Sequence, residues 1–535
     1  MQVKTCFMTL SLLLSTPAMA QTTLIQGTVA NGGPVRSAEV TVIDKNGSQQ
    51  STKTDQQGRF SLDASSLQAP LLLSSVDPRL PDGKTSHNCL NSDTQRARCM
   101  ASVLPQLHHG KTNVANITPF TDRLVSEIAV SLKFIGPQQW IESGSAEAMK
   151  AELLQQPLAH FHAGMDAALT RAGIQDAATF NPISTPMQAN GQGIDAILLV
   201  INHNRGYDNN SGQAGETTLS DISFRPLVGL TASDPYEPFD YTRAKKEREA
   251  IIAAKTRVLI VGDSTAATYE VSRLPRMGWG QVFQQRFRDG AQVQVLNGAR
   301  SGRSSRDFYN EGWYQQMARF IKPGDVVLID LGHNDENCNA AKPIRGAADV
   351  KNLCSYPNDA QGMKQYPAGQ PKLSFQNALE NYINLAREKG ATPILMTPTT
   401  RFTNADRKQA FKDGDTRPVI SSHYTRQNSA NGYAFTGDYS ATIKKTAQDK
   451  QVPLIDLEQL TIDFANHHAS DWTSYWLAID PNDSRYPYYK TQTAGVMSKP
   501  DTTHFQQKGA EAVAELVAGA IKQNTQLTSL AGQLN

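Results

Sequence analysis

The sequence predicts an α/β protein. Its C-terminal half is expected to form a doubly wound, five-stranded parallel sheet, preceded by a small β-sandwich and a helical region. Val258 to Val261 and Val326 to Ile329 are short unbroken apolar runs, typical of parallel strands that are covered on both faces. Helical patterns alternate with such runs from residue 257 onward. Residues 23–75 instead read as short strands with alternating apolar and polar positions, separated by turns.

The elements of the parallel sheet follow from these patterns. Strands are expected at 257–261, 292–296, 325–331, 393–396 and 452–456, and helices near 304–321, 374–389, 440–450 and 506–522. Helices on both faces would bury every strand of the sheet. Because 535 residues are too many for one ordinary core, two or three domains are expected.

The first twenty residues have the pattern of an export signal. Lys4 supplies a positive charge, residues 7–14 are apolar, and Ala18-Met19-Ala20 forms a small-residue cleavage site. No later apolar run is long enough to span a bilayer. We therefore expect an exported protein that is secreted, with the periplasm as the alternative.

The next segments divide by pattern. Residues 21–115 are expected to form the β-sandwich, because strands near 24–29, 38–43 and 54–62 are bounded by turn residues. The strings at Gly33 to Val40 and Thr54 to Phe60 resemble the carboxypeptidase-regulatory type of module, and we favour a spacer role over glycan binding.

A helical region is expected at 116–205. Thr118-Pro119 supplies a cap and a proline at the first helical position, and a second helical run lies near 146–171. Residues 206–256, polar and then charged, are interpreted as a connector, in part an ordered extended segment packed on the neighbouring domains. Residues 257–524 are interpreted as the catalytic domain and 525–535 as a tail.

Three short blocks indicate the chemistry. Gly262-Asp263-Ser264-Thr265 follows a predicted buried strand, which places Ser264 at the carboxyl edge of the sheet. Asp501-Thr502-Thr503-His504 brings a carboxylate and an imidazole onto one turn. A serine hydroxyl needs a neighbouring imidazole to take its proton, and that imidazole needs an acceptor to fix its tautomer. The blocks therefore predict a serine hydrolase with Ser264, His504 and Asp501 as its catalytic residues.

An ester carbonyl under attack also requires hydrogen-bond donors at its oxygen. Asn334, in the block Gly332-His333-Asn334-Asp335, offers a side-chain amide at the end of a predicted strand. Gly302 offers a backbone N–H with no side chain in the way, and the N–H of Ser264 is the third candidate.

Taken in order, these blocks resemble the SGNH (GDSL-type) esterase superfamily, whose namesake residues would be Ser264, Gly302, Asn334 and His504. The resemblance spans roughly residues 257–522 and is closest to the rhamnogalacturonan and pectin acetylesterase branch. It implies a flavodoxin-like sheet and removal of O-acetyl groups from pectin by a Ser-His-Asp acyl-enzyme mechanism. It also implies an acetylated pectic polysaccharide or oligosaccharide as the partner. The alternatives are an esterase of xylan, lipid or aryl esters, and a carbohydrate-binding protein with a relic site, against which the intact blocks argue.

Side chains near these blocks are candidates for substrate contact. Four arginines fall on predicted site-side loops, and guanidinium groups pair with the carboxylates of galacturonate; ordinary solvated charge is the alternative. The candidates are Arg303 and Arg401 in first place, with Arg300 and Arg306. His333 is expected to contact substrate or to support the site, and Trp279, Tyr269 and Tyr309 to stack on sugars or to pack in the core.

The cysteines outside the signal form two local pairs, Cys89 with Cys99 and Cys338 with Cys354. An even number in an exported chain favours disulfides, and the two local pairings are preferred over the other arrangements. Their spacing does not suit zinc.

A formal net charge of +2 supports neither nucleic-acid nor membrane binding. We expect a monomer that requires neither a metal nor an organic cofactor.

Overall fold

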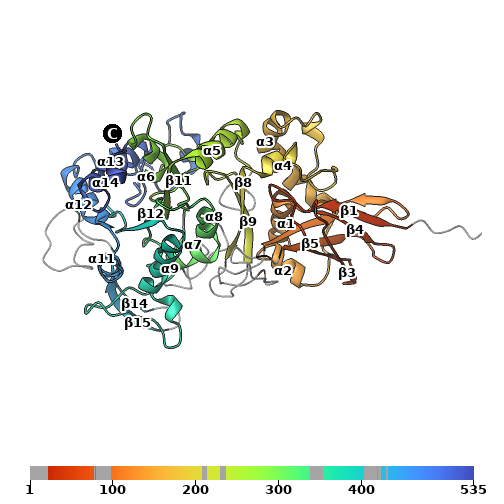
Figure 1. The fold of residues 1–535 in the computed structure, drawn as a ribbon, viewed down its shortest axis with the longest axis horizontal. Helices are drawn as coiled ribbons and strands as arrows, with labels where there is room; N and C mark the ends of the chain where they lie inside the picture. The colour runs from red at the N-terminus through yellow and green to blue at the C-terminus, as the bar shows by residue number, and fades with distance from the viewer. Residues whose placement is uncertain are drawn as a thin grey trace, which may run out of the picture.

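A computed structural model describes residues 22–77, 79, 89, 98–207, 214–228, 236–337, 353–402, 419, 423–428 and 432–535. The predicted export signal lies outside these residues. Figure 1 shows the N-terminal strands at one end of an elongated molecule and the C-terminal sheet at the other, with a hairpin between them. Within the described ranges, no helix has the length and apolarity needed to cross a membrane.

The N-terminal segment forms two facing sheets. One has the order β4-β1-β7 and the other β3-β2-β5-β6. The strands are β1 (Leu24–Thr28), β2 (Glu39–Ile43), β3 (Gln49–Lys53), β4 (Arg59–Asp63), β5 (Leu71–Asp77), β6 (Arg98–Leu104) and β7 (Thr112–Val114). Alternate residues such as Val40, Val42, Phe60 and Leu62 are buried between the sheets.

The helices expected after the sandwich are present. They are α1 (Pro119–Ser131), α2 (Pro137–Glu142), α3 (Gln155–Arg171) and α4 (Ile194–Leu198). The expected start of α1 is confirmed: Thr118 is the N-cap, its hydroxyl accepts from the N–H of Thr121, and Pro119 occupies the first turn.

The predicted connector is ordered and contains regular elements, and the strand that leads into it begins within 116–205, the region predicted to be helical. A hairpin of β8 (Ile201–Tyr207) and β9 (Ala214–Asp221) is followed by α5 (Tyr241–Ala253). The polar sequence concealed this because its polar side chains are buried against one another. Arg205 pairs with the buried Asp122 at 2.5 Å, and Asp122 also accepts from Thr217 at 2.6 Å and from His203 at 2.8 Å. Polarity here reflects a satisfied internal network, not exposure.

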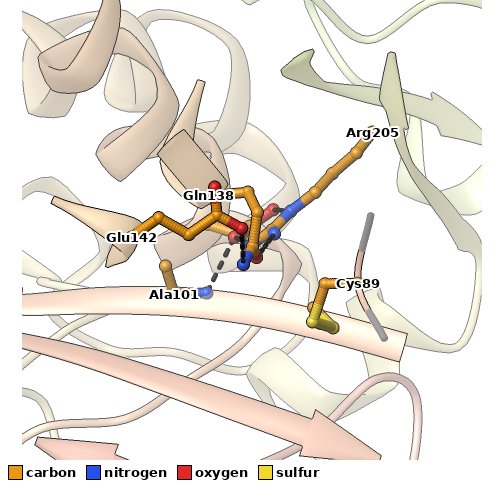
Figure 2. Close-up of a disulfide and its surroundings, with 7 residues drawn as sticks. Cys89, Ala101, Gln138, Glu142 and Arg205 are labelled. Carbon is orange, nitrogen blue, oxygen red and sulfur yellow. Dashed lines mark hydrogen bonds and ion pairs between the residues drawn. A yellow bond between two sulfur atoms is a disulfide. The ribbon is translucent and has the colours of Figure 1, made fainter. Parts of the chain in front are cut away.

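A disulfide between Cys89 and Cys99 lies beside this network, and it confirms one predicted pairing. Figure 2 shows Arg205 and Gln138 reaching toward each other near the disulfide, where the guanidinium donates to the amide oxygen at 3.1 Å. Cys99 is on β6, and Ala101 on the same strand donates its N–H to Asp122 at 2.7 Å. Cys354 is also disulfide-bonded. Cys338 lies outside the described residues.

The C-terminal sheet has the five parallel strands that were predicted, and their order is β11-β10-β12-β13-β16. They are β11 (Val293–Asn297), β10 (Thr256–Gly262), β12 (Val326–Asp330), β13 (Thr392–Met396) and β16 (Leu454–Ile455). An antiparallel pair, β14 (Tyr424–Asn428) and β15 (Ala434–Asp438), stands apart from it. The order makes β10 and β12 neighbours, so their carboxyl ends meet.

Helices cover both faces of this sheet. Residues of α7 (Ser305–Asn310), α8 (Trp313–Ala318), α9 (Phe375–Glu388) and α11 (Tyr439–Lys450) share one core, and residues of α6 (Trp279–Val282), α12 (Leu457–His467), α13 (Gln507–Gln523) and α14 (Thr528–Ala531) share the other. One predicted helix, 304–321, is thus divided into α7 and α8, because Gly312 between them adopts a left-handed conformation with φ of 82°. The expected tail contains α14, whose Leu530 is buried.

The core on the α7–α9 face continues into the N-terminal half. It includes Leu259 and Val327 of the sheet, Leu219 of the hairpin, Phe120 of α1 and Leu72 of the sandwich. The hairpin also donates to the catalytic half directly, since the Asn204 amide reaches the carbonyl of Glu311 at 2.8 Å. The segments that sequence patterns separate therefore pack as one continuous structure.

Candidate active site

Ser264 lies on the turn that leaves β10. The carboxylate of Asp263 accepts from the N–H of Thr265 at 3.0 Å and from its hydroxyl at 2.9 Å, which fixes the turn. The phenol of Tyr269 donates to the Ser264 carbonyl at 2.7 Å. Ser264 is 6% exposed, so its hydroxyl is held in a largely dry position.

His504 and Asp501 arrive from the loop before α13. The Nε2 atom of His504 lies 2.9 Å from Ser264 Oγ, and its Nδ1 lies 2.7 Å from Asp501 Oδ2. The other oxygen of Asp501 accepts the backbone N–H groups of Thr503 at 2.8 Å and His504 at 3.1 Å. The structure therefore brings together the three side chains that sequence reasoning grouped, 240 residues apart at their widest.

The loop that carries this pair is anchored on both sides. Leu477 donates its N–H to the His504 carbonyl at 2.8 Å and accepts from the N–H of Asp501 at 2.9 Å. On the other side, Phe402 donates to the carbonyl of Thr502 at 2.8 Å. Because these backbone hydrogen bonds fix the loop, the imidazole of His504 keeps its orientation toward Ser264.

Electrostatics keep Asp501 ionised and His504 neutral. Burial opposes ionisation of Asp501, but the charge and hydrogen bond of His504, followed by the Thr503 N–H and Arg276, hold its pKa below the ordinary value. Burial, followed by the positive charge of Arg276, lowers the pKa of His504, although Asp501 acts in the opposite direction. A neutral imidazole beside an ionised carboxylate is the state that can accept a proton from a hydroxyl.

The donors expected at an oxyanion lie on loops at the same edge of the sheet as Ser264, because β11 and β12 both pair with β10 in parallel. Asn334 is mostly buried, and its Nδ2 uses one hydrogen on the Arg303 carbonyl at 3.0 Å, which leaves a second N–H. Gly302 has φ of 78°, a value that favours glycine. In the part of the chain that the structure describes, the N–H groups of Gly302 and Ser264 meet no acceptor. Asp335 ties neighbouring loops by accepting from the hydroxyls of Ser305 and Ser355, each at 2.6 Å.

His333 and Arg401 belong to a charged cluster that the sequence did not reveal. His333 is buried, and its Nε2 lies 3.2 Å from Thr399 Oγ1. Arg401 donates to Glu336 at 3.0 Å and to the His333 carbonyl at 3.3 Å. The other oxygen of Glu336 lies 2.6 Å from Nδ1 of the buried His423. Glu336 directly follows the Gly332–Asp335 block, which was a possible signal, but nothing in the sequence pointed to His423.

Other expected contact residues pack against protein groups, and all of them except the partly exposed Tyr309 are buried. Arg303 is 1% exposed and pairs with Glu311 at 2.9 Å, and the indole of Trp279, fully buried, donates to Asp330 at 2.8 Å. Arg306 donates to the Cys354 carbonyl at 2.5 Å. Arg300 lies over Trp313, 4.6 Å from the ring centroid to Cζ, and Tyr309 packs against Tyr382 with their centroids 5.3 Å apart.

Burial also governs the carboxyl groups beneath the nucleophile. Asp263 and Asp330 are fully buried, and burial raises the pKa of both. Within the described ranges, no group of three or more His, Cys, Asp or Glu side chains is arranged to hold a metal ion.

Comparison with known proteins agrees with this geometry. The GDSL-like lipase/acylhydrolase family model matches residues 258–517. Rhamnogalacturonan acetylesterase RhgT of Bacillus subtilis is 29% identical over 268 residues, which cover 50% of this chain and 90% of RhgT. A rhamnogalacturonan acetylesterase of Emericella nidulans is 30% identical over 190 residues, covering 35% of this chain and 69% of that protein.

One solved structure is similar over half of the chain's length. The crystal structure of the Bacillus subtilis protein YxiM matches with 23% identity and a TM-score of 0.32, covering 50% of this chain and 57% of that one.

Proposed function

Because this chain belongs to the GDSL-like lipase/acylhydrolase family and is a carboxylic ester hydrolase, we propose that it removes acetyl groups from pectic polysaccharides through a covalent acyl-enzyme. The observation that carries the proposal is the continuous contact from Asp501 through His504 to Ser264, at 2.7 and 2.9 Å. Export of the chain is part of this proposal, because it suits a polymeric substrate.

Acylation begins at Ser264. His504 Nε2 takes the hydroxyl proton as Oγ attacks the acetyl carbonyl, and Asp501 stabilises the imidazolium that forms. The negative oxygen then faces the N–H groups of Ser264 and Gly302 and the Asn334 amide. When the tetrahedral intermediate collapses, the C–O bond to the sugar breaks, and His504 gives its proton to the departing sugar oxygen.

Deacylation repeats these reaction steps with water as the nucleophile. His504, neutral again, takes a proton from water as its oxygen attacks the acetyl-enzyme. The second tetrahedral intermediate uses the same donors, and its collapse returns the proton to Ser264 and releases acetate. Because each step needs only these side chains, the rate should depend on how well the oxyanion is stabilised.

A pectic substrate is supported by the names of two relatives and by local charge. Both relatives are called rhamnogalacturonan acetylesterases. Arg401 and Arg276 bring positive charge close enough to lower the pKa of His504. Galacturonate residues of pectin carry carboxylates that such charge attracts. We retain the partly exposed Arg401 as a proposed substrate-facing group, and we leave out Arg303, Trp279 and His333 because they are buried.

The test is acetate release by the purified mature protein from acetylated rhamnogalacturonan, acetylated homogalacturonan and acetylated xylan, beside a small aryl acetate. We expect release from a pectic substrate that Ser264→Ala lowers by several orders of magnitude. Near-normal turnover by Ser264→Ala would refute the mechanism. Hydrolysis of the aryl acetate or xylan without release from either pectin would keep the serine mechanism and refute the pectic substrate.

A further inference from the structure

Arg276 is held beside the catalytic pair by backbone contacts. It forms an antiparallel bridge with Gln506, and the next residue, Met277, donates its N–H to the carbonyl of Phe505 at 3.0 Å. Phe505 and Gln506 directly follow His504. The arginine is thus fixed next to the base by main-chain hydrogen bonds, and its guanidinium lowers the pKa values of both His504 and Asp501.

The guanidinium has no carboxylate within ion-pair distance among the residues that the structure describes. Its Nε atom is buried and has no hydrogen-bond partner there. By contrast, the buried guanidinium of Arg257 pairs with Asp325 at 2.7 Å, and that of Arg303 pairs with Glu311. The charge of Asp501 acts on Arg276 from beyond ion-pair distance, but its two oxygens already accept from His504 and Thr503. A partly buried guanidinium with a donor left unbonded beside a reacting centre indicates a ligand that completes it.

Aromatic rings frame this cation. Its Cζ lies 4.5 Å from the centroid of the Tyr269 ring, whose hydroxyl donates to the Ser264 carbonyl. Tyr489 lies on the same side of the site, and its hydroxyl donates to the carbonyl of Arg273, three residues before Arg276, at 2.8 Å. Arg276 is itself only partly exposed. A guanidinium stacked on one ring keeps its planar edge available for a flat, bidentate partner.

We propose that Arg276 is a binding site for the carboxylate of a uronate residue in the substrate chain, close to the acetylated sugar in the active site. This inference rests on the proposed function and deepens it. A carboxylate carries the opposite charge, is planar like the guanidinium, and offers two acceptor oxygens to its N–H donors. The enzyme would therefore prefer acetylated pectic chains whose neighbouring uronates are free acids over chains in which those carboxyl groups are neutral.

The experiment compares matched substrates. Kinetic constants are measured on acetylated pectic oligosaccharides with free carboxylates and on the same oligosaccharides after reduction of the carboxyl groups to neutral sugars. A neutral aryl acetate is the third substrate. The variants are Arg276→Gln, Arg276→Lys and a control, Arg288→Gln, which removes an exposed arginine. Thermal unfolding of each variant checks that it is folded.

For Arg276→Gln we expect a rise in KM on the free-acid oligosaccharide on the order of 10- to 100-fold, the value of a hydrogen-bonded charge pair. KM on the reduced oligosaccharide should change little. Arg276→Lys keeps the charge without the planar fork and should lie between wild type and Arg276→Gln. On the aryl acetate, the acid limb of kcat/KM should move to higher pH in Arg276→Gln, because the charge that lowers the His504 pKa is gone. Arg288→Gln should match wild type throughout.

Equal losses on the free-acid and reduced oligosaccharides would overturn the carboxylate site. If Arg276→Gln fails to fold, the wild-type protein still decides, because equal kcat/KM on the two oligosaccharides would overturn the proposal. A protein that cleaves the aryl acetate but neither oligosaccharide would instead refute the pectic function itself.

Discussion

His423 Nδ1 lies 2.6 Å from Glu336 Oε1, and the opposite ring nitrogen lies 2.9 Å from the carbonyl oxygen of Thr399. A carbonyl can only accept, and an ionised carboxylate can only accept, so both ring nitrogens must donate. The buried ring is therefore an imidazolium, and its hydrogen bond with Glu336 helps to hold the side chain that pairs with Arg401. Burial works against this charge, but Glu336 and then Glu458 outweigh it and raise the pKa of His423.

This pairing predicts a pH-dependent stability. Because the pKa of His423 is raised in the folded state, its contribution is complete below the unfolded value of 6.5 and is lost as pH rises through the folded value. Urea unfolding of His423→Gln should show a loss of about 1–3 kcal/mol at acidic pH and a smaller loss at alkaline pH. The control is His162→Gln, whose partly exposed pair with Asp166 should matter little. A loss that does not vary with pH would contradict the charged ring.

The pH dependence of catalysis should be displaced toward acid. His504 must be neutral to act as a base, and its pKa is lower than the ordinary 6.5 because of burial and then Arg276. The acid limb of kcat/KM on a neutral aryl acetate should therefore have its midpoint below pH 6.5. A midpoint above that value would show that Asp501 dominates the environment of the ring.

The Asn334 amide should contribute to the rate and not to substrate affinity. Its Nδ2 has one N–H on the Arg303 carbonyl, and the second is available to an oxyanion. Steady-state kinetics of Asn334→Ala should show kcat lower by about 10²–10³ with KM nearly unchanged. A change confined to KM would mean that the amide binds the ground state and not the developing charge.

Arg303 should act on stability. Its pair with Glu311 is almost fully buried, and removing one member leaves a charge without compensation. Arg303→Gln should lower the free energy of unfolding by about 3–5 kcal/mol. The matched control is Arg59→Gln, since the pair of Arg59 with Asp55 is exposed at 63% and 42% and should be close to neutral. A folded Arg303→Gln protein with normal stability and a raised KM would restore Arg303 as a substrate contact.

The sequence by itself determined the features that are local along the chain. Strands β10 and β12 could be predicted because their apolar runs are continuous, and the start of α1 because Thr118 and Pro119 are adjacent to it. Asp501 and His504 could be paired because they share one turn. Predicted boundaries failed where local patterns mislead: α7 and α8 were predicted as one helix, and the first strand of the hairpin, β8, fell mostly in the region predicted to be helical.

Tertiary structure decided what depends on residues far apart in sequence. Four arginines could be proposed as contacts for carboxylates of the substrate. Whether a guanidinium instead pairs with a carboxylate of the protein depends on residues distant in sequence, as in the contact between Arg401 and Glu336, 65 residues apart. Arg303 turned inward to Glu311, whereas Arg276, which no motif marked, came to lie beside His504. Periodicity reports which face of an element is buried, whereas charge pairing is set by elements that meet only after the chain has folded.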